Sequence, residues 1–247
     1  MFNRQPVVVG GNGHSGTRVF IDIISRSGVF CGVRSLTKRK DSEDLRIIGL
    51  LNRWGPPYIY KTLNGKQESQ MKRAFARRLR LYFPLRRRPW GFKNPRSMHI
   101  LPVLHQLFPG MKFVHVIRDG RDISLGNEFV ASNRYVDAYL ERDERKLPPE
   151  QKMILYWGRS NQRAMEYGTA ALGDRYKLMR WEDLCGNPQS MARELIRFAG
   201  GTESLAAQAS RLVEKPKSIG RWASFPSAVR DPVVARGARW LSLFGYS

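Results

Sequence analysis

Cysteine, long apolar runs and acidic residues are all scarce in this sequence. Two cysteines, Cys31 and Cys185, occur in 247 residues, and neither has the spacing of a metal-ligand cluster. We therefore expect reduced thiols, no disulfide and no metal site. No apolar run approaches the roughly 18 residues of a membrane span. The first strand is expected by residue 6, which leaves no room for a signal peptide, so these absences together predict a cytoplasmic protein.

The shortage of acidic residues makes the chain strongly basic. Lys and Arg number 43 against 21 Asp and Glu, a formal net charge of +22. Such a charge attracts anions, whether nucleic acid, acidic lipid or a polyanionic substrate, and carries no information about the fold. The length fits one α/β domain spanning residues 1–247.

Glycine, in contrast, is concentrated near the amino terminus. Residues 7–9 are all valine and predict a strand buried on both faces; four of the seven residues that follow, 10–16, are glycine. A helix is expected next, with Ser15 or Thr17 as its cap and residues 19, 20, 23 and 24 as its apolar face. A strand, a glycine loop and a helix N-terminus together present backbone N–H groups to an anion. The segment therefore predicts a phosphate-binding loop.

Three phosphate-binding patterns overlap in this loop. Gly11-x-Gly13-x-x-Gly16 matches the dinucleotide fingerprint, but basic residues at 34–40 follow the next candidate strand, 29–33, so only an NADP type fits. A nucleotide-triphosphate loop would end in Gly-Lys-Ser/Thr, and this one ends in Gly16-Thr17-Arg18. The third pattern is the 5′-phosphosulfate loop of sulfotransferases. His14-Ser15-Gly16-Thr17 resembles that loop, with histidine where the family usually has Lys or Arg. A strand–turn–helix without a ligand is the alternative.

Two further buried strands are expected at residues 90–93 and 112–117. The helix between them is expected to be capped by Ser97 and stopped by residues 109–110. This order predicts a parallel sheet with right-handed crossovers, in which ligands bind beyond the carboxyl ends of the strands. Those ends are residues 10–18, Lys93 and 118–122. Other helices are expected at 41–53, 67–83, 149–171 and 205–213, and residues 188–200 are interpreted as a connection.

Several segments resemble those of sulfotransferases, in the family's order and over nearly the whole chain. Lys93-Asn94-Pro95, Phe108-Pro109, Lys112-Phe113 and the run 117–122 resemble the central segment, nearest to the protein-tyrosine and carbohydrate branches. Residues 176–188, 218–222 and 244–246 resemble the later ones. The resemblance implies an α/β three-layer sandwich with a central, mostly parallel sheet. It also implies a P-loop-NTPase-like phosphate-binding loop after the first strand.

The resemblance also implies an activity, the transfer of a sulfuryl group from 3′-phosphoadenosine 5′-phosphosulfate to an acceptor hydroxyl or amine. The residues that would hold the 5′-phosphosulfate are Gly13, His14, Ser15, Gly16 and Thr17. Arg18 either projects toward this group or is exposed or ion-paired.

The resemblance assigns the 3′-phosphate to Arg118, with Ser218 and Arg221 closing over it. The family usually has a serine eight residues after that arginine, but here the position is Gly126, and Ser124 lies two residues earlier. Trp181 stands where the family has an aromatic residue near the adenine. A core tryptophan is the alternative for that position.

Transfer requires positive charge near the oxygen that bridges sulfur and phosphorus. Lys93 is the first candidate and His14 the second; an imidazole carries a charge only when protonated. The resemblance makes Asp41 or Glu43 the base for the acceptor proton, and leaves open which of the two it is. Helix capping is the alternative role for these carboxylates.

The acceptor class stays open among sugar, glycolipid, peptide tyrosine and small alcohol. The basic segment 72–96 suits an anionic membrane surface or an acidic acceptor, so the protein is expected to be cytoplasmic or peripheral at a membrane; a solvated basic face is the alternative. No nucleic-acid-binding motif surrounds this segment, which argues against nucleic acid. Two rival functions are considered. An NADP-dependent oxidoreductase leaves residues 118–122 unexplained, and a nucleic-acid or membrane-surface binding protein leaves the glycine loop unexplained.

Overall fold

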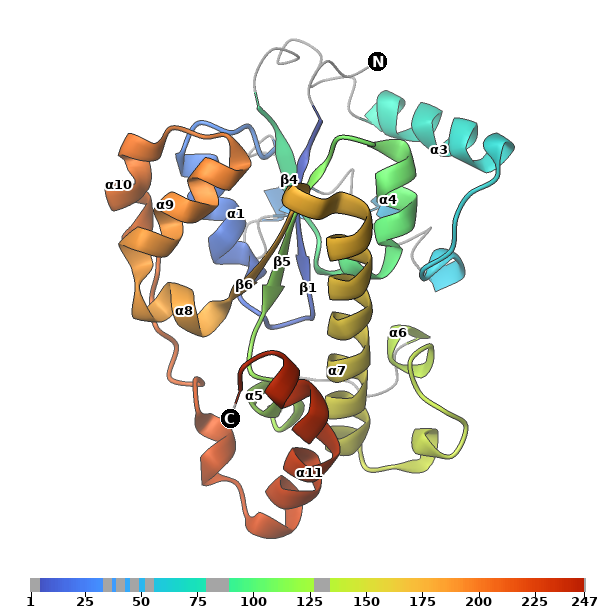
Figure 1. The fold of residues 1–247 in the computed structure, drawn as a ribbon, viewed down its shortest axis with the longest axis vertical. Helices are drawn as coiled ribbons and strands as arrows, with labels where there is room; N and C mark the ends of the chain where they lie inside the picture. The colour runs from blue at the N-terminus through green and yellow to red at the C-terminus, as the bar shows by residue number, and fades with distance from the viewer. Residues whose placement is uncertain are drawn as a thin grey trace.

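A four-stranded parallel sheet lies at the centre of the computed structural model (Figure 1). Its strands, in spatial order, are β4 (Gly91–Lys93), β1 (Val7–Gly11), β5 (Lys112–Ile117) and β6 (Tyr176–Arg180). Val9 is in register with Lys93 on one side and Val114 on the other. The structure describes residues 5–32, 37–38, 43–44, 49–51, 56–78, 89–126 and 134–246.

The valines of β1 show why this strand is central. Successive side chains of a strand point to opposite faces of the sheet. Val7 and Val9 accordingly belong to one apolar cluster and Val8 to another, and all three are buried. Both faces of the sheet must therefore be covered by helices.

One face is covered by four helices, which lie together to the left of the sheet in Figure 1. They are α1 (Thr17–Arg26), α8 (Trp181–Gly186), α9 (Pro188–Ala199) and α10 (Ala206–Ser210). Phe20 and Ile23 of α1 pack with Leu195 and Ile196 of α9 in this cluster.

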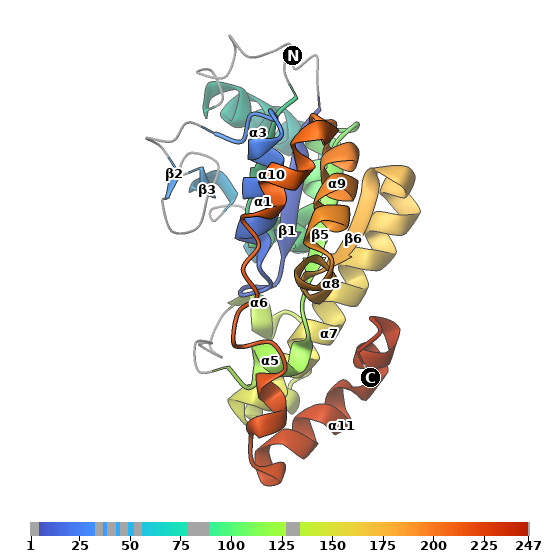
Figure 2. The ribbon, with the colours of Figure 1, turned by 90° about the vertical axis from the view of Figure 1, so that its left-hand side faces the viewer.

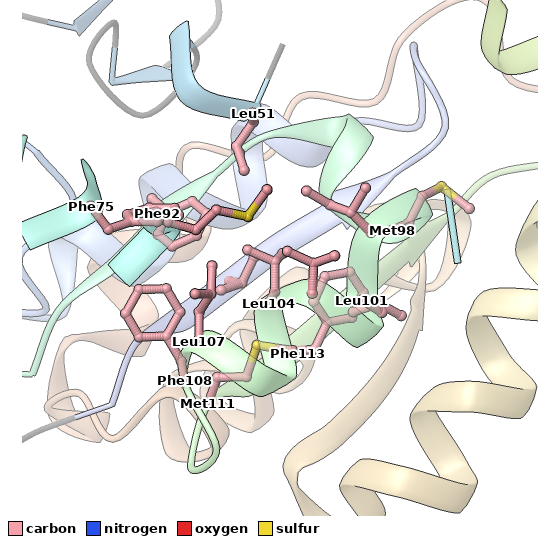
Figure 3. Close-up of a cluster of buried hydrophobic side chains, with 14 of the residues drawn as sticks. Leu51, Phe75, Phe92, Met98, Leu101, Leu104, Leu107, Phe108, Met111 and Phe113 are labelled. Atoms are coloured by element: carbon pink, nitrogen blue, oxygen red, sulfur yellow. The ribbon is translucent and has the colours of Figure 1, made fainter. Parts of the chain in front are cut away.

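The other face packs against α3 (Gly65–Arg78), α4 (Leu101–Leu107) and part of α7 (Pro149–Tyr167). Figure 3 shows the aromatic side chains of this cluster meeting the leucines of α4. Phe75 packs edge-on against Phe108, with ring centroids 5.2 Å apart. Burying a side chain of this size stabilises the fold by about 1.5–3 kcal/mol. The two helical layers and the sheet form the predicted α/β three-layer sandwich.

A third apolar cluster lies beyond the carboxyl ends of the strands. The helices α5 (Gly120–Ser124), α6 (Arg134–Asp137) and α11 (Ser227–Leu243) meet α7 there, below the sheet in Figure 2. Trp157 of α7 is fully buried and contacts Phe244 and Tyr246. This packing brings the carboxyl-terminal residues to the edge of the sheet that the glycine loop occupies. Across the described ranges, no helix is long and apolar enough to cross a membrane.

Several local predictions are wrong. Residues 29–32 form no strand; Phe30 makes a single bridge to Trp90. Glu43–Asp44 is a strand, β3, and not the start of a helix: it pairs antiparallel with β2 (Thr37–Lys38). In that register Lys38 is opposite Glu43.

The helix caps also differ from prediction. Asn94, and not Ser97, caps the 3₁₀ helix Pro95–Ile100, and Gly16 precedes α1 without a side-chain cap. Residues 188–199 are the helix α9 and not a connection. This helix has proline at its first position and ends at Gly200, whose φ of 77° is left-handed. Beyond residue 78, the predicted helix 67–83 lies outside the described residues.

Candidate functional site

The glycine loop between β1 and α1 is tightly enclosed. A Cβ atom on Gly16, whose φ is +83°, would lie 2.7 Å from the Trp181 ring, so only glycine fits there. His14, at φ +66°, is also left-handed and is exposed. Trp181 is 4% exposed, and its ring centroid lies 6.2 Å from that of Phe20. Trp181 is therefore a core residue that lies directly against the loop, and a contact with adenine stays a prediction.

The loop also contains a buried hydroxyl group. Ser15 is fully buried, and its Oγ has no hydrogen-bond partner among the described residues. Gly13 precedes this part of the loop, and Thr17 and the exposed Arg18 begin α1, whose first turn has no acidic residue. The first N–H groups of a helix have no partner within the helix. This end of α1 therefore has the chemistry of an anion site.

Lys93 lies beside the start of the loop. It ends β4, is in register with Val9 of β1 and is 6% exposed. The N–H of Asn94 donates to the Val9 carbonyl at 3.1 Å, and the Asn94 side chain accepts from the Arg96 N–H at 2.9 Å. These two hydrogen bonds fix the backbone that follows Lys93, one through the Asn94 main chain and one through its side chain. Lysine is seldom this buried in a protein core.

Arg118 connects the loop with the carboxyl-terminal part of the chain. It follows β5 directly and is 8% exposed. Its Nη1 lies 3.5 Å from the His14 carbonyl oxygen. Its Nη2 donates to the Ser218 carbonyl at 2.6 Å and to Ser218 Oγ at 3.0 Å. Its buried Nε has no partner among the described residues.

The position of the family's usual serine is occupied differently. A Cβ on Gly126 would lie 2.7 Å from Nη2 of Arg221, so the guanidinium fills the room of a side chain. Ser124, at the end of α5, is buried, and its Oγ has no partner within the described ranges. The structure thus brings Arg118 together with Ser218, and Gly126 with Arg221, although these segments are about 100 positions apart; their binding of a 3′-phosphate stays a prediction.

Asp122 has no predicted role, yet it is central to this arrangement. It is 3% exposed; its Oδ2 accepts from the Gly220 N–H at 2.8 Å and its Oδ1 from the Trp222 N–H at 2.9 Å. Next to it, Arg121 pairs with Asp119 at 2.8 Å and lies 3.9 Å from the centre of the Trp222 ring. A sequence signal existed in the run 118–122, where two carboxylates alternate with two arginines.

Glu182 ties the chain end to the same turn. Its carboxylate accepts from the Asp119 N–H at 3.0 Å and from the Tyr246 hydroxyl at 2.9 Å. Burial, together with the Glu182 charge, raises the pKa of the Tyr246 hydroxyl, which therefore stays protonated and donates. A cleft of about 210 Å³ lies between these groups and Gly220.

The two candidate bases are not placed by the described residues. Asp41 lies outside them, and Glu43 is described only as backbone in β3. Their role in accepting a proton stays a prediction. In the described part of the chain, no group of three or more His, Cys, Asp or Glu is arranged to hold a metal ion.

A second buried polar cluster lies between the sheet and α7, and it contains no charge. His99 bonds the hydroxyls of Tyr139 and Tyr156, each at 2.9 Å. His115 bonds the Tyr176 hydroxyl at 2.7 Å and Asn161 Oδ1 at 2.9 Å. Burial lowers the pKa of His99 to about 3 and that of His115 to about 4, so both imidazoles are neutral at pH 7.

Comparison with known proteins identifies the family and the fold. A family model described as the sulfotransferase family matches residues 6–203. Among solved structures, the sulfotransferase domain of the Synechococcus PCC 7002 olefin synthase is 16% identical, with a TM-score of 0.55 over 100% of this chain and 97% of that one. An Alicyclobacillus acidocaldarius sulfotransferase is 15% identical, with a TM-score of 0.55 over 99% and 97%. One from Mycobacterium tuberculosis H37Rv is 13% identical, with a TM-score of 0.51 over 96% and 77%. At these identities the similarity shows the fold. No curated protein sequence matches the chain.

Proposed function

Because the chain belongs to the sulfotransferase family, we propose that it transfers a sulfuryl group from 3′-phosphoadenosine 5′-phosphosulfate to a hydroxyl or amine of an acceptor. The proposal is supported above all by Arg118, whose guanidinium contacts both the His14 carbonyl of the glycine loop and Ser218 of the carboxyl-terminal segment. Arg118 therefore joins the two segments to which we assign the phosphate groups. A donor with phosphate groups at both ends of its ribose matches such a double site.

The chemistry of the buried groups fits that donor. Ser15 Oγ, Ser124 Oγ and Arg118 Nε have no partner among the described residues. A buried polar group without a partner costs about 1–3 kcal/mol, so these groups favour a ligand with acceptor oxygens. We assign Gly13 to Thr17 to the 5′-phosphosulfate. Arg118, Ser124, Ser218 and Arg221 are assigned to the 3′-phosphate, and Trp181 to the adenine side.

The protein's contribution to the reaction is electrostatic and positional. The donor supplies an activated sulfuryl group. Lys93, with His14 as the second candidate, stabilises negative charge on the oxygen that bridges sulfur and phosphorus. Asp41 or Glu43 takes the acceptor proton while the acceptor oxygen bonds to sulfur and the bond from sulfur to the bridging oxygen breaks. The other product is adenosine 3′,5′-bisphosphate, and no residue is assigned to a metal.

We propose a carbohydrate or glycolipid as the acceptor, within one catalytic domain over residues 1–247. The basis is the resemblance of residues 93–122, which is nearest to the protein-tyrosine and carbohydrate branches; a tyrosine peptide is therefore the alternative acceptor. A transfer screen with radiolabelled donor, offering sugars, glycolipids, tyrosine peptides and small alcohols, tests this choice. If label appeared only on a peptide or a small alcohol, that compound class would replace carbohydrate as the proposed acceptor. The assignment of the donor would be unaffected.

The donor is tested by calorimetry with adenosine 3′,5′-bisphosphate, NADP and ATP. We expect the bisphosphate to bind at least about tenfold more tightly than the other two, a difference of about 1.4 kcal/mol. Arg118→Ala should remove this preference. Arg193→Ala, which changes an exposed arginine of α9, is the matched control and should keep it. Equal or tighter binding of NADP would contradict the proposed function and favour an oxidoreductase.

A further inference from the structure

We propose that Asp122 is a positioning residue, which holds residues 218–222 so that Ser218 and Arg221 lie beside Arg118 and make the site selective for a 3′-phosphate. The inference rests on the proposed function and adds a residue to which the sequence assigns no task. Asp122 reaches across about 100 positions of the chain to do this.

The contacts of Asp122 are those of an anchor. Each carboxylate oxygen accepts one backbone N–H, from Gly220 and Trp222, at 2.8 and 2.9 Å. Charge-assisted hydrogen bonds of this kind are stronger than neutral ones. The two donors flank Arg221 directly, so the carboxylate fixes the backbone from which the Arg221 side chain extends. The Trp222 ring is held in addition by the Arg121 guanidinium, 3.9 Å away.

The consequence of this anchor is seen at Gly126. The guanidinium of Arg221 fills the space that a side chain at this position would need. A planar, permanently charged donor group thus lies where the family has a serine hydroxyl. Its placement requires that residues 218–222 stay where Asp122 holds them.

The same carboxylate leaves Arg118 available to an anion. Asp122 Oδ2 is 3.5 Å from Arg118 Nη2, a long contact, while its short contacts go to the backbone. Arg118 is therefore only weakly paired by Asp122, and its buried Nε has no partner among the described residues. A short bidentate pair would instead have used up the Arg118 donors.

The test compares two nucleotides that differ by one phosphate. Calorimetry measures the affinities of the parent protein and of Asp122→Asn for adenosine 3′,5′-bisphosphate and for adenosine 5′-phosphate. The amide is isosteric but accepts at one atom only, so one anchor bond is lost. We expect the ratio of the two affinities to fall about tenfold or more, as for a lost charge-assisted bond, with 5′-phosphate affinity unchanged within about twofold.

Two further variants sharpen the result. Asp231→Asn, which changes an exposed carboxylate of α11, is the matched control and should keep the parent ratio. Gly126→Ala should displace Arg221 while Asp122 is intact, and should lower the ratio by a similar factor. Combining it with Asp122→Asn should add little, because both act on one placement. If Asp122→Asn fails to fold, Gly126→Ala carries the test, and an unchanged ratio there overturns the inference.

The outcomes separate this inference from the function on which it rests. A parent protein without preference for the bisphosphate would contradict the proposed function itself. A parent preference that Asp122→Asn retains would contradict the positioning role alone. An equal loss of both affinities would also contradict it, because a residue that only stabilises the fold affects both nucleotides alike.

Discussion

Two buried polar clusters, at neighbouring places in the molecule, use opposite chemistry. The charged cluster, at the turn after β5, consists of Arg118, Asp119, Arg121, Asp122 and Glu182. The neutral cluster, between the sheet and α7, consists of His99, His115, Tyr139, Tyr156, Asn161 and Tyr176. Hydrogen bonds run through both. The hydrogen bonds of the charged cluster reach residues 218–222, about 100 positions along the chain, whereas those of the neutral cluster join residues 40 to 61 positions apart.

The difference follows from the cost of burying charge. A buried ion is stable only if its partners replace the water that it has lost. In the charged cluster every carboxylate accepts hydrogen bonds from backbone N–H groups. Asp119 accepts from Arg121, and Glu182 accepts from the N–H of Asp119. Asp122 accepts from Gly220 and Trp222. In the neutral cluster the partners are hydroxyl and amide groups, and the imidazoles lose their charge instead. Charge is thus retained where an anionic ligand is proposed to bind, and absent where the layers are packed.

The largest expected effect is that of replacing Lys93 on kcat. Lys93 is a buried lysine beside the glycine loop, and we propose that it stabilises charge in the transition state. If its charge serves the reaction, Lys93→Ala should lower kcat by about 10²–10³ or more, as for the loss of one electrostatic donor. Affinity for adenosine 3′,5′-bisphosphate should stay within a few-fold, because the loss falls on the transition state. Rapid-quench transfer assays and calorimetry measure the two quantities.

Lys112→Ala is the matched control. Lys112 lies in the same sheet, at the amino-terminal end of β5, and so at the end of the strands opposite to the glycine loop. Its Nζ donates to the Phe198 carbonyl, so a modest loss of stability with normal kcat is expected. A near-normal kcat for Lys93→Ala would show that buried charge here is structural.

Arg118→Lys comes next and tests the charged cluster itself. The substitution keeps the positive charge and removes the planar guanidinium. In the parent protein that guanidinium donates two hydrogen bonds to Ser218. We expect about a tenfold loss of affinity for the bisphosphate, equivalent to one charge-assisted hydrogen bond. If Arg118→Lys kept the full affinity for the bisphosphate, a point charge would suffice for binding and the planar geometry of the guanidinium would not be needed. Calorimetry of the lysine variant beside Arg118→Ala separates charge from geometry.

Much of the sheet is predictable from the sequence, and much of the site's internal geometry is not. β1 begins with three valines and β5 is apolar apart from Lys112 and His115, so their burial and parallel pairing follow from local pattern. The interpretation of residues 188–200 as a connection is wrong, although Ala192, Leu195, Ile196 and Ala199 form a helical apolar face that the sequence contains.

The anchor role of Asp122 could not be predicted, for a physical reason. Its partners are backbone N–H groups, which every residue except proline carries and which therefore leave no mark on the sequence. The pairing of His99 with two tyrosines depends likewise on how the 3₁₀ helix packs on α7. Resemblance placed Arg118, Ser218 and Arg221 near one another; the way they are held required the structure.

The neutral cluster predicts a dependence of stability on pH. In the unfolded chain, histidine titrates near pH 6.5. In the folded protein, burial lowers the pKa of His115 to about 4 and that of His99 to about 3. As the pH falls from 6.5 to 4, the unfolded state gains protons that the folded state does not. The free energy of unfolding should therefore fall by up to about 1.4 kcal/mol per pH unit for each histidine.

Urea unfolding at pH 7, 6, 5 and 4 measures this slope. His115→Gln keeps an amide in place of the imidazole and removes the titrating group, so its slope should be smaller than that of the parent by one histidine's share. Equal slopes would show that His115 titrates alike in both states, and the contrast between the two clusters would lose its basis.

The smallest effect is expected from the exposed charge on the surface of α3. Arg73, Arg77 and Arg78 are exposed on α3, within the basic segment predicted to meet an anionic membrane or an acidic acceptor. Exposed charges act over roughly one Debye length, about 8–10 Å at physiological salt. Changing all three to Gln should weaken binding to vesicles containing anionic lipid, or the use of an acidic acceptor, by a few-fold at low salt. The effect should vanish at high salt, and bisphosphate affinity should not change.

The control changes three exposed arginines elsewhere, Arg193, Arg211 and Arg236. If both triple variants behave alike, the basic face of α3 has no specific partner.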